Sequence, residues 1–158
     1  MFELLVIERK RKLFSPSSIT ISGKLSDHYE FVTRGTSKII NKDGVSICLY
    51  NSLLNYTFSQ KDIKPKLLSA PSLIEFIIPS IGLLSITEVN AKYRSLTFEV
   101  FLDGNLLGNI SLCNLSFIPW LETYSVSCSG EAPEQDHVDV LIFSLFVVFC
   151  EKSTYVGT

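Results

Sequence analysis

The sequence is poor in the residues that build metal sites and disulfide frameworks. Its four cysteines, Cys48, Cys113, Cys128 and Cys150, are scattered, and none forms a CxxC pair. Zinc knuckles need paired cysteines, and small secreted scaffolds carry a denser set. We therefore expect four reduced, partly buried thiols.

Catalytic motifs are also missing. The chain has two histidines, His28 and His137, and no GxSxG, HExxH, Walker or GxGxxG spacing. Asp136, His137 and Asp139 could supply ligands to a divalent metal. The interpretation that we favour is a solvated helix start whose acids cap free N–H groups. We predict a protein that is not an enzyme and carries no cofactor and no metal.

No hydrophobic run is long enough to cross a membrane. The longest candidate, Val138–Cys150, would rise only about 20 Å as a helix, against a hydrocarbon core of about 30 Å. Basic residues follow the apolar start Met1–Ile7 instead of preceding it, which is the wrong order for a secretory signal. We expect a cytoplasmic protein without a transmembrane segment, with peripheral membrane attachment as an option.

Basic residues are almost absent from the second part of the chain. Up to Arg94 there are 13 Lys and Arg against 8 Asp and Glu, and from Ser95 onward Lys152 is the one base against eight acids. A folded domain can interleave the two parts and cancel this asymmetry. If it does not, one surface could meet an anionic partner.

Short apolar runs rich in Ile, Val, Phe, Tyr and Thr fill most of the sequence, and Gly and Asp-Gly steps separate them, which predicts strands and turns. The expected strands are Phe2–Glu8, Tyr29–Arg34, Ser37–Asn41, Val45–Tyr50, Leu73–Ile78, Leu83–Val89, Ser95–Leu102, Leu106–Cys113 and Thr123–Cys128. Pro65–Pro71 and Ser129–Gln135 are expected loops, and Trp120 is expected to cover the core.

Two tight hairpins are predicted at Asp43-Gly44 and Asp103-Gly104, because Asp-Gly supplies the positive φ angles that such turns require. The apolar run Val138–Cys150 favours a strand by composition and a helix by length. A helix that is apolar on all sides must be covered on every face. We therefore predict a single, mainly β domain over residues 1–158, an antiparallel β-barrel or half-barrel of hairpins around a hydrophobic C-terminal helix.

This pattern resembles the superfamily of tubby C-terminal domains, phospholipid scramblases and LURP-one-related proteins. The residues that carry the resemblance are Tyr29–Val32 with the Asp43-Gly44 hairpin, Phe98–Asn105 running into Leu107–Ile110, Trp120, Tyr124–Val126 and Phe149–Glu151. The resemblance implies a twelve-stranded barrel threaded by the C-terminal helix, and binding of membrane phosphoinositides through basic surface residues. The chain is shorter than a full family domain and lacks the Pro-rich leader and cysteine cluster of scramblases, so lipid scrambling is not implied.

The basic residues offer the clearest candidate site. We expect Arg9, Lys10, Arg11 and Lys12, joined by Lys61, Lys64 and Lys66, to bind anionic lipid. On a strand, Arg9 and Arg11 would point to one face and Lys10 and Lys12 to the other. The competing interpretation is a solvated edge strand whose charges discourage aggregation.

The predicted function is thus a non-enzymatic binding module that engages an anionic membrane surface, such as one with phosphoinositide, or a protein partner. Nucleic acid is not an expected partner, since the pI is near 5.7. One alternative is a carrier barrel that encloses a small hydrophobic ligand. A second is an enzyme with a dispersed active site. The sequence does not indicate an oligomeric state.

Overall fold

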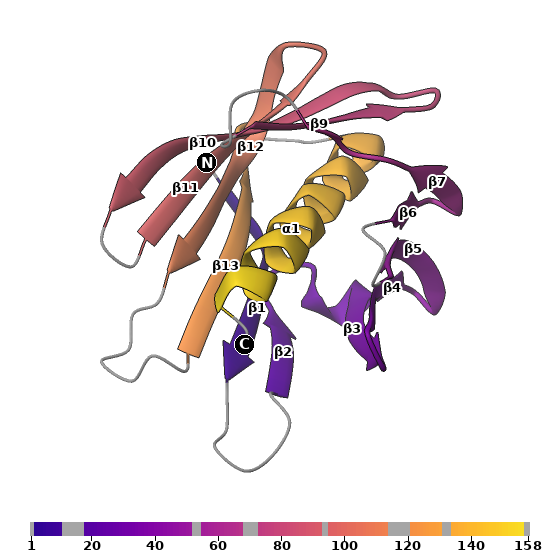
Figure 1. The fold of residues 1–158 in the computed structure, drawn as a ribbon, viewed down its shortest axis with the longest axis vertical. Coiled ribbons are helices and arrows are strands. Elements are labelled where there is room, and N and C mark those ends of the chain that lie inside the picture. The colour runs from indigo at the N-terminus through magenta and orange to yellow at the C-terminus, as the bar shows by residue number, and fades with distance from the viewer. Residues whose placement is uncertain are drawn as a thin grey trace.

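The computed structural model of this chain describes residues 2–10, 18–51, 55–67, 73–92, 95–113, 121–130 and 134–156. These residues form two antiparallel sheets, one 3-10 helix and one long C-terminal α-helix (Figure 1). The predicted fold class is therefore confirmed. Within the described residues, the two sheets curve around the helix without joining into one closed ladder.

The larger sheet has eight strands and includes both the first and the last strand of the chain as described. Its order is β2 (Ser18–Ser22), β1 (Phe2–Lys10), β13 (Leu121–Cys128), β12 (Asn105–Cys113), β11 (Ser95–Leu102), β10 (Gly82–Lys92), β9 (Leu73–Ile78) and β8 (Lys66–Leu67). The basic strand β1 lies directly beside β13. This pairing brings the basic start of the chain next to its acidic second part.

The smaller sheet has five strands and follows the 3-10 helix η1 (Ser26–His28). Its order is β3 (Tyr29–Arg34), β4 (Ser37–Lys42), β5 (Val45–Tyr50), β6 (Tyr56–Phe58) and β7 (Lys61–Ile63). Strand β2 contacts β3, and β7 contacts β9. The two sheets thus approach each other along two seams and leave a space between their inner faces for the helix.

Both predicted hairpins are confirmed. Asp43 has φ 49° and Gly44 has φ 83° between β4 and β5, while Asp103 has φ 50° and Gly104 has φ 83° between β11 and β12. Positive φ at both central residues is the geometry that matches the twist of paired strands. Local sequence chemistry therefore sets the position of these two turns.

Helix α1 (Gln135–Val156) lies between the two sheets, as Figure 1 shows. Every residue from Val140 to Cys150 is at most 2% exposed. Phe143 packs against Phe58 of the smaller sheet and Phe76 of the larger one, with ring centroids 4.9 and 5.2 Å away. The apolar run is therefore a helix covered on all sides. Among the described residues, no helix has the length and apolar character that crossing a bilayer needs.

Close packing of the helix explains one glycine in a strand. A Cβ added at Gly108 of β12 would overlap the carbonyl oxygen of Ser127 and lie 3.0 Å from a methyl group of Leu141. Glycine is expected wherever another backbone approaches this closely. Gly108 thus allows α1 and β13 to pack at this point.

Four short strands were not predicted: β2, β6, β7 and β8. Strand β8 lies inside the expected loop Pro65–Pro71, and the expected loop Ser129–Gln135 ends where α1 begins, at Gln135. These strands have two to five residues, which is too short for a periodic pattern to be recognised. Trp120 lies outside the described residues.

Candidate functional site

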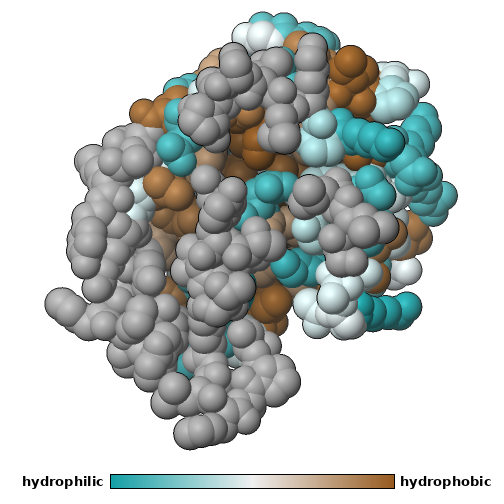
Figure 2. Space-filling model, viewed as in Figure 1, coloured by the Kyte–Doolittle hydropathy of each residue, from teal (hydrophilic) through white to brown (hydrophobic). Residues whose placement is uncertain are grey.

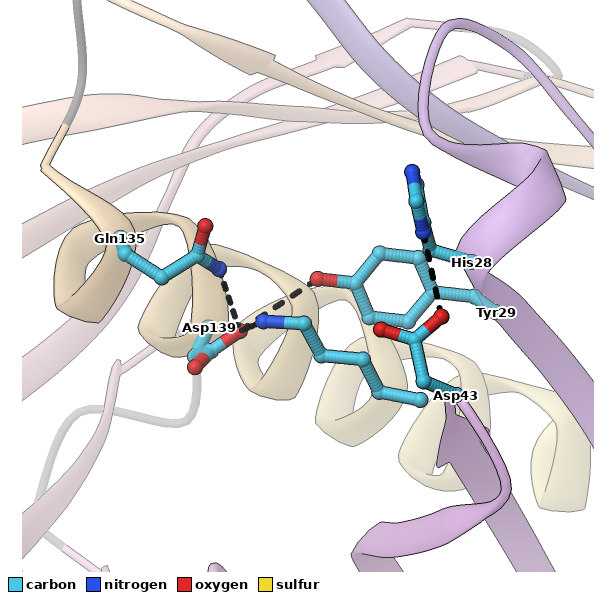
Figure 3. A network of polar contacts seen from close by, with 6 residues as sticks. His28, Tyr29, Asp43, Gln135 and Asp139 are labelled. Atoms are coloured by element: carbon cyan, nitrogen blue, oxygen red, sulfur yellow. Dashed lines mark hydrogen bonds and ion pairs between the residues drawn. The ribbon is translucent and has the colours of Figure 1, made fainter.

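A network of polar side chains ties the start of α1 to the smaller sheet. One oxygen of Asp139, Oδ1, accepts hydrogen bonds from Lys42 Nζ at 3.0 Å, Gln135 Nε2 at 3.2 Å and Tyr29 Oη at 3.3 Å (Figure 3). Lys42 and Asp139 also form an ion pair, and both side chains are less than a quarter exposed. Asp139 therefore bonds to side chains here, in contrast to its expected role as a helix cap.

A second pair lies beside this network. His28 Nδ1 is 3.1 Å from Asp43 Oδ1, and the Asp43 backbone N–H donates to the His28 carbonyl at 2.9 Å. Both side chains are exposed. Because Asp43 belongs to the β4–β5 turn and His28 to η1, the pair holds the entry to β3 against that turn.

Tyr29 acts as a hydrogen-bond donor at this site and not as a base. Burial raises the pKa of its phenol well above the ordinary value, and the neighbouring Asp139 carboxylate raises it further. The ammonium of Lys42 lies 5.9 Å from the centre of the same ring. The hydroxyl therefore keeps its proton at neutral pH.

A cavity of about 340 Å³ opens next to these residues. We call it the α1-start cavity. Its apolar lining comes from Leu4, Leu25 and Val138, and Tyr29, Lys42 and Gln135 of the network also border it. Leu4 and Val138 are almost fully buried. The cavity combines an apolar floor with polar groups at its edge, a combination typical of small-molecule sites.

In the part of the chain that the structure describes, the side chains around the cavity do not assemble a metal centre. His137 is 4.0 Å from Glu134, and Asp136 is exposed. Within the described ranges, no group of three or more His, Cys, Asp or Glu side chains is placed to hold a metal ion. The hydrogen-bonding groups that line the cavity can bind and orient a small ligand.

Buried thiols elsewhere are held in the protonated form. Burial raises the pKa of Cys48 and of Cys150 well above the ordinary thiol value. Burial likewise raises the pKa of Tyr56, whose hydroxyl donates to Glu151 Oε1 at 2.7 Å. Because a thiolate is the reactive form of cysteine, Cys48 and Cys150 are structural residues of the core.

Arg9, an expected lipid contact, lies on the inner face of the larger sheet. It is 9% exposed, and its partner across the ladder is Glu122 of β13, which is 2% exposed. Tyr124 donates a hydrogen bond of 2.6 Å to Glu122. Opposite charges on facing strand positions attract each other. The alternation of β1 that buries Leu5 and Ile7 thus also turns Arg9 inward and removes it from any flat binding surface.

Lys10 takes the opposite orientation. It is exposed at the last position of β1 and borders an outer groove of about 340 Å³ with Glu8, Ser18, Thr20 and Leu121. Arg11 and Lys12 lie outside the described residues. Lys10 is thus the described member of the basic tetrad that remains available to a surface partner.

The second expected basic group belongs to another part of the molecule. Lys61, the first residue of β7, and Lys64, which follows that strand, are both exposed. Lys66 begins β8, and its side chain lies outside the described part. Figure 1 places the end of β1 at the lower edge of the molecule and β7 at its right edge. In Figure 2 hydrophilic side chains gather on that right side. The structure therefore does not bring Lys61 and Lys64 together with Lys10.

Sequence reasoning missed Tyr29 and Lys42. They are separated from Asp139 by 110 and 97 positions, so no local spacing links them. The signals that could have drawn attention to them are a lysine directly before the Asp-Gly turn and an aspartate at the edge of an otherwise apolar run. Neither signal indicates which residue the side chain contacts in the folded protein.

No protein-family model, curated protein or solved structure matches this chain. The tubby-like resemblance therefore stays a prediction.

Loss of Asp139 is expected to destabilise the fold. Asp139→Ala should lower the free energy of unfolding by about 1–3 kcal/mol, because it leaves the buried Tyr29 hydroxyl and the Lys42 ammonium without their acceptor. Urea unfolding followed by circular dichroism measures the change. Asp136→Ala, an exposed acid in the first turn of α1, is the matched control and should cost about 0.5 kcal/mol or less. Equal losses in both variants would contradict the assigned role of Asp139.

Proposed function

We propose that this protein is a non-enzymatic binding module of the tubby-like or LURP-one-like kind that engages an anionic membrane surface through the basic end of β1. Phosphoinositide is the headgroup that we expect to be preferred. A protein surface in place of the membrane is the alternative partner.

The observation that carries the proposal is the position of α1. Its residues from Val140 to Cys150 occupy the space between the sheets and are at most 2% exposed. A carrier barrel would need this space for its cargo. Recognition at the outer surface is the function that this arrangement favours.

The positive charge for binding an anionic surface comes from the residues at the end of β1. Lys10 is exposed, and Arg11 and Lys12 follow it in the sequence. Basic residues near an anionic bilayer contribute about 1 kcal/mol each. Three of them would contribute about 3 kcal/mol, a useful but reversible attachment that salt should weaken. Arg9, opposite Glu122 on the inner face, is not counted.

Vesicle flotation tests the proposal. The vesicles are phosphatidylcholine alone, phosphatidylcholine with phosphatidylserine, and phosphatidylcholine with phosphatidylinositol bisphosphate. We expect binding to the anionic vesicles, strongest with the bisphosphate. The triple variant Lys10→Gln, Arg11→Gln, Lys12→Gln should weaken it by about 100-fold, since each 1.4 kcal/mol is tenfold.

The control removes three charges elsewhere. Lys61→Gln, Lys64→Gln, Lys66→Gln changes the net charge by the same amount, but Lys61 and Lys64 lie on another side of the molecule (Figure 1). We expect near wild-type flotation for this control. Equal weakening by both triple variants would show a general charge effect and overturn the β1 site. Absence of flotation by the wild type would overturn the lipid proposal.

A further inference from the structure

The α1-start cavity has two kinds of wall. Its floor consists of Leu4, Leu25 and Val138, from β1, the turn after β2, and α1. Charged or titratable side chains line its edge: Lys24, His28, Lys42 and Asp43. A ligand that fits both walls needs an apolar body and a polar head.

The polar groups at the edge favour an anionic head. Within the described residues, Asp139 is the acceptor that Lys42 contacts, and an ammonium has three N–H groups, so two remain for a ligand. His28 uses Nδ1 on Asp43, which leaves Nε2. In Figure 3, Gln135 and Asp139 lie at the hydroxyl end of Tyr29, and His28 lies above the Tyr29 ring, beside Asp43.

The acids near the cavity are already in contact with protein donors. Oδ1 of Asp139 accepts from three side chains, and Oδ1 of Asp43 faces His28. A cationic ligand would have to compete with these internal donors. An anion instead meets the ammonium of Lys42 at the edge of the cavity, and charge-assisted hydrogen bonds of this kind are the stronger ones.

We propose that the α1-start cavity binds a small amphipathic carboxylate, with its carboxylate at Lys42 and its apolar body over Leu25 and Val138. A volume of about 340 Å³ is at the lower end of the range for small-molecule sites. A short aliphatic or aromatic acid fits this space, whereas a two-chain lipid does not. The site is separate from the β1 end that faces the membrane in the proposed function.

Four probes of the same protein test the ligand class at pH 7: hexanoate, acetate, hexanol and hexylamine. Titrations are followed by chemical-shift changes in two-dimensional NMR spectra of the labelled full chain. We expect hexanoate to bind with a Kd on the order of 1 mM, and to shift the signals of Leu25, Tyr29 and Val138. Acetate lacks the apolar body, hexanol lacks the charge, and hexylamine carries the opposite charge. Each of the three should therefore bind at least tenfold more weakly than hexanoate.

Two variants test the place. Leu25→Trp fills the cavity and leaves the residues that bond to Asp139 unchanged in the sequence, and hexanoate affinity should fall at least tenfold. Lys42→Gln removes the proposed partner of the carboxylate and should reduce affinity on the order of tenfold, while Lys61→Gln should leave it unchanged. If Lys42→Gln destabilises the fold, the hexanoate affinity of Leu25→Trp alone tests whether the ligand binds in the cavity.

Three results would overturn the inference. Hexanoate could fail to bind, hexylamine could bind as tightly as hexanoate, or Leu25→Trp could leave hexanoate affinity intact while its spectrum shows a folded chain. None of these three results changes the outcome expected in the vesicle flotation experiment. The membrane proposal is therefore tested independently of the cavity proposal.

Discussion

Phe143→Ala is expected to lower the free energy of unfolding by about 3–5 kcal/mol, the range measured for large aromatic side chains removed from cores. Phe143 is fully buried and lies within 6.0 Å, between ring centroids, of Tyr56, Phe58 and Phe76. Tyr56 and Phe58 belong to the smaller sheet and Phe76 to the larger one. Truncation therefore opens a cavity where the helix joins the two sheets.

Urea unfolding, monitored by far-ultraviolet circular dichroism, measures this loss. Ile77→Ala is the control, because Ile77 follows Phe76 on β9 but is 71% exposed. Removing an exposed side chain changes stability by about 0.5 kcal/mol or less. A loss below about 1 kcal/mol for Phe143→Ala would mean that α1 is not packed between the sheets in solution, and the membrane and cavity proposals would both lose their structural basis.

Stability is expected to fall steeply above about pH 9. Burial, with neighbouring charges, raises the pKa of Cys48 and of Cys150 above the ordinary thiol value of 9.0 and the pKa of Tyr29 and of Tyr56 above the ordinary phenol value of 10.0. Near Cys150, Lys38 partly offsets the effect of burial. All four groups thus hold their protons more tightly in the folded chain than in the unfolded chain.

The sign of the pH effect follows from this difference. Well below pH 9 both states are protonated and the stabilisation is complete. As the pH rises toward the pKa values of the folded state, the unfolded chain releases protons that the folded chain keeps. The free energy of unfolding therefore falls. Each group contributes a slope that approaches about 1.4 kcal/mol per pH unit. The two thiols together approach about 2.7 kcal/mol per unit, and the two phenols add to this above pH 10.

Unfolding in urea at pH 7, 9, 10 and 10.5, under reducing conditions, tests the expectation. The double variant Cys48→Ala, Cys150→Ala should be less stable at pH 7 but lose less stability between pH 9 and 10. Between pH 10 and 10.5 it should still decline, because Tyr29 and Tyr56 remain. A wild-type stability that is flat from pH 7 to 10.5 would contradict the burial of these groups.

Much of the fold could be predicted because its signals are local. The alternation of Ser95–Leu102 and the Asp103-Gly104 turn lie within a few residues of one another, and both keep their predicted form. Length and uniform apolar character predicted a covered helix at the C-terminal end, and α1 extends that prediction to 135–156. The short strands β6 and β7 were not predicted, because three residues are too few to show an alternating apolar pattern.

The candidate sites were less accessible to sequence reasoning. Arg9 was expected at the surface as part of a basic tetrad, but the pairing of β1 with β13 places it opposite Glu122 on the inner face. The cavity beside Asp139 joins residues from both sheets and the helix. Neither position could be read from a motif, because each depends on which strands pair and in what register.

The sequence alone thus determined a mainly β chain, its two tight turns and the need to cover its apolar C-terminal segment. These features follow from backbone preferences and apolar periodicity, which act over a few residues. The tertiary structure decided which charges are buried, which basic residues share a surface and where a cavity opens. Those properties arise from contacts between segments about 100 positions apart, such as Tyr29 with Asp139, and the local sequence does not encode which segments will meet.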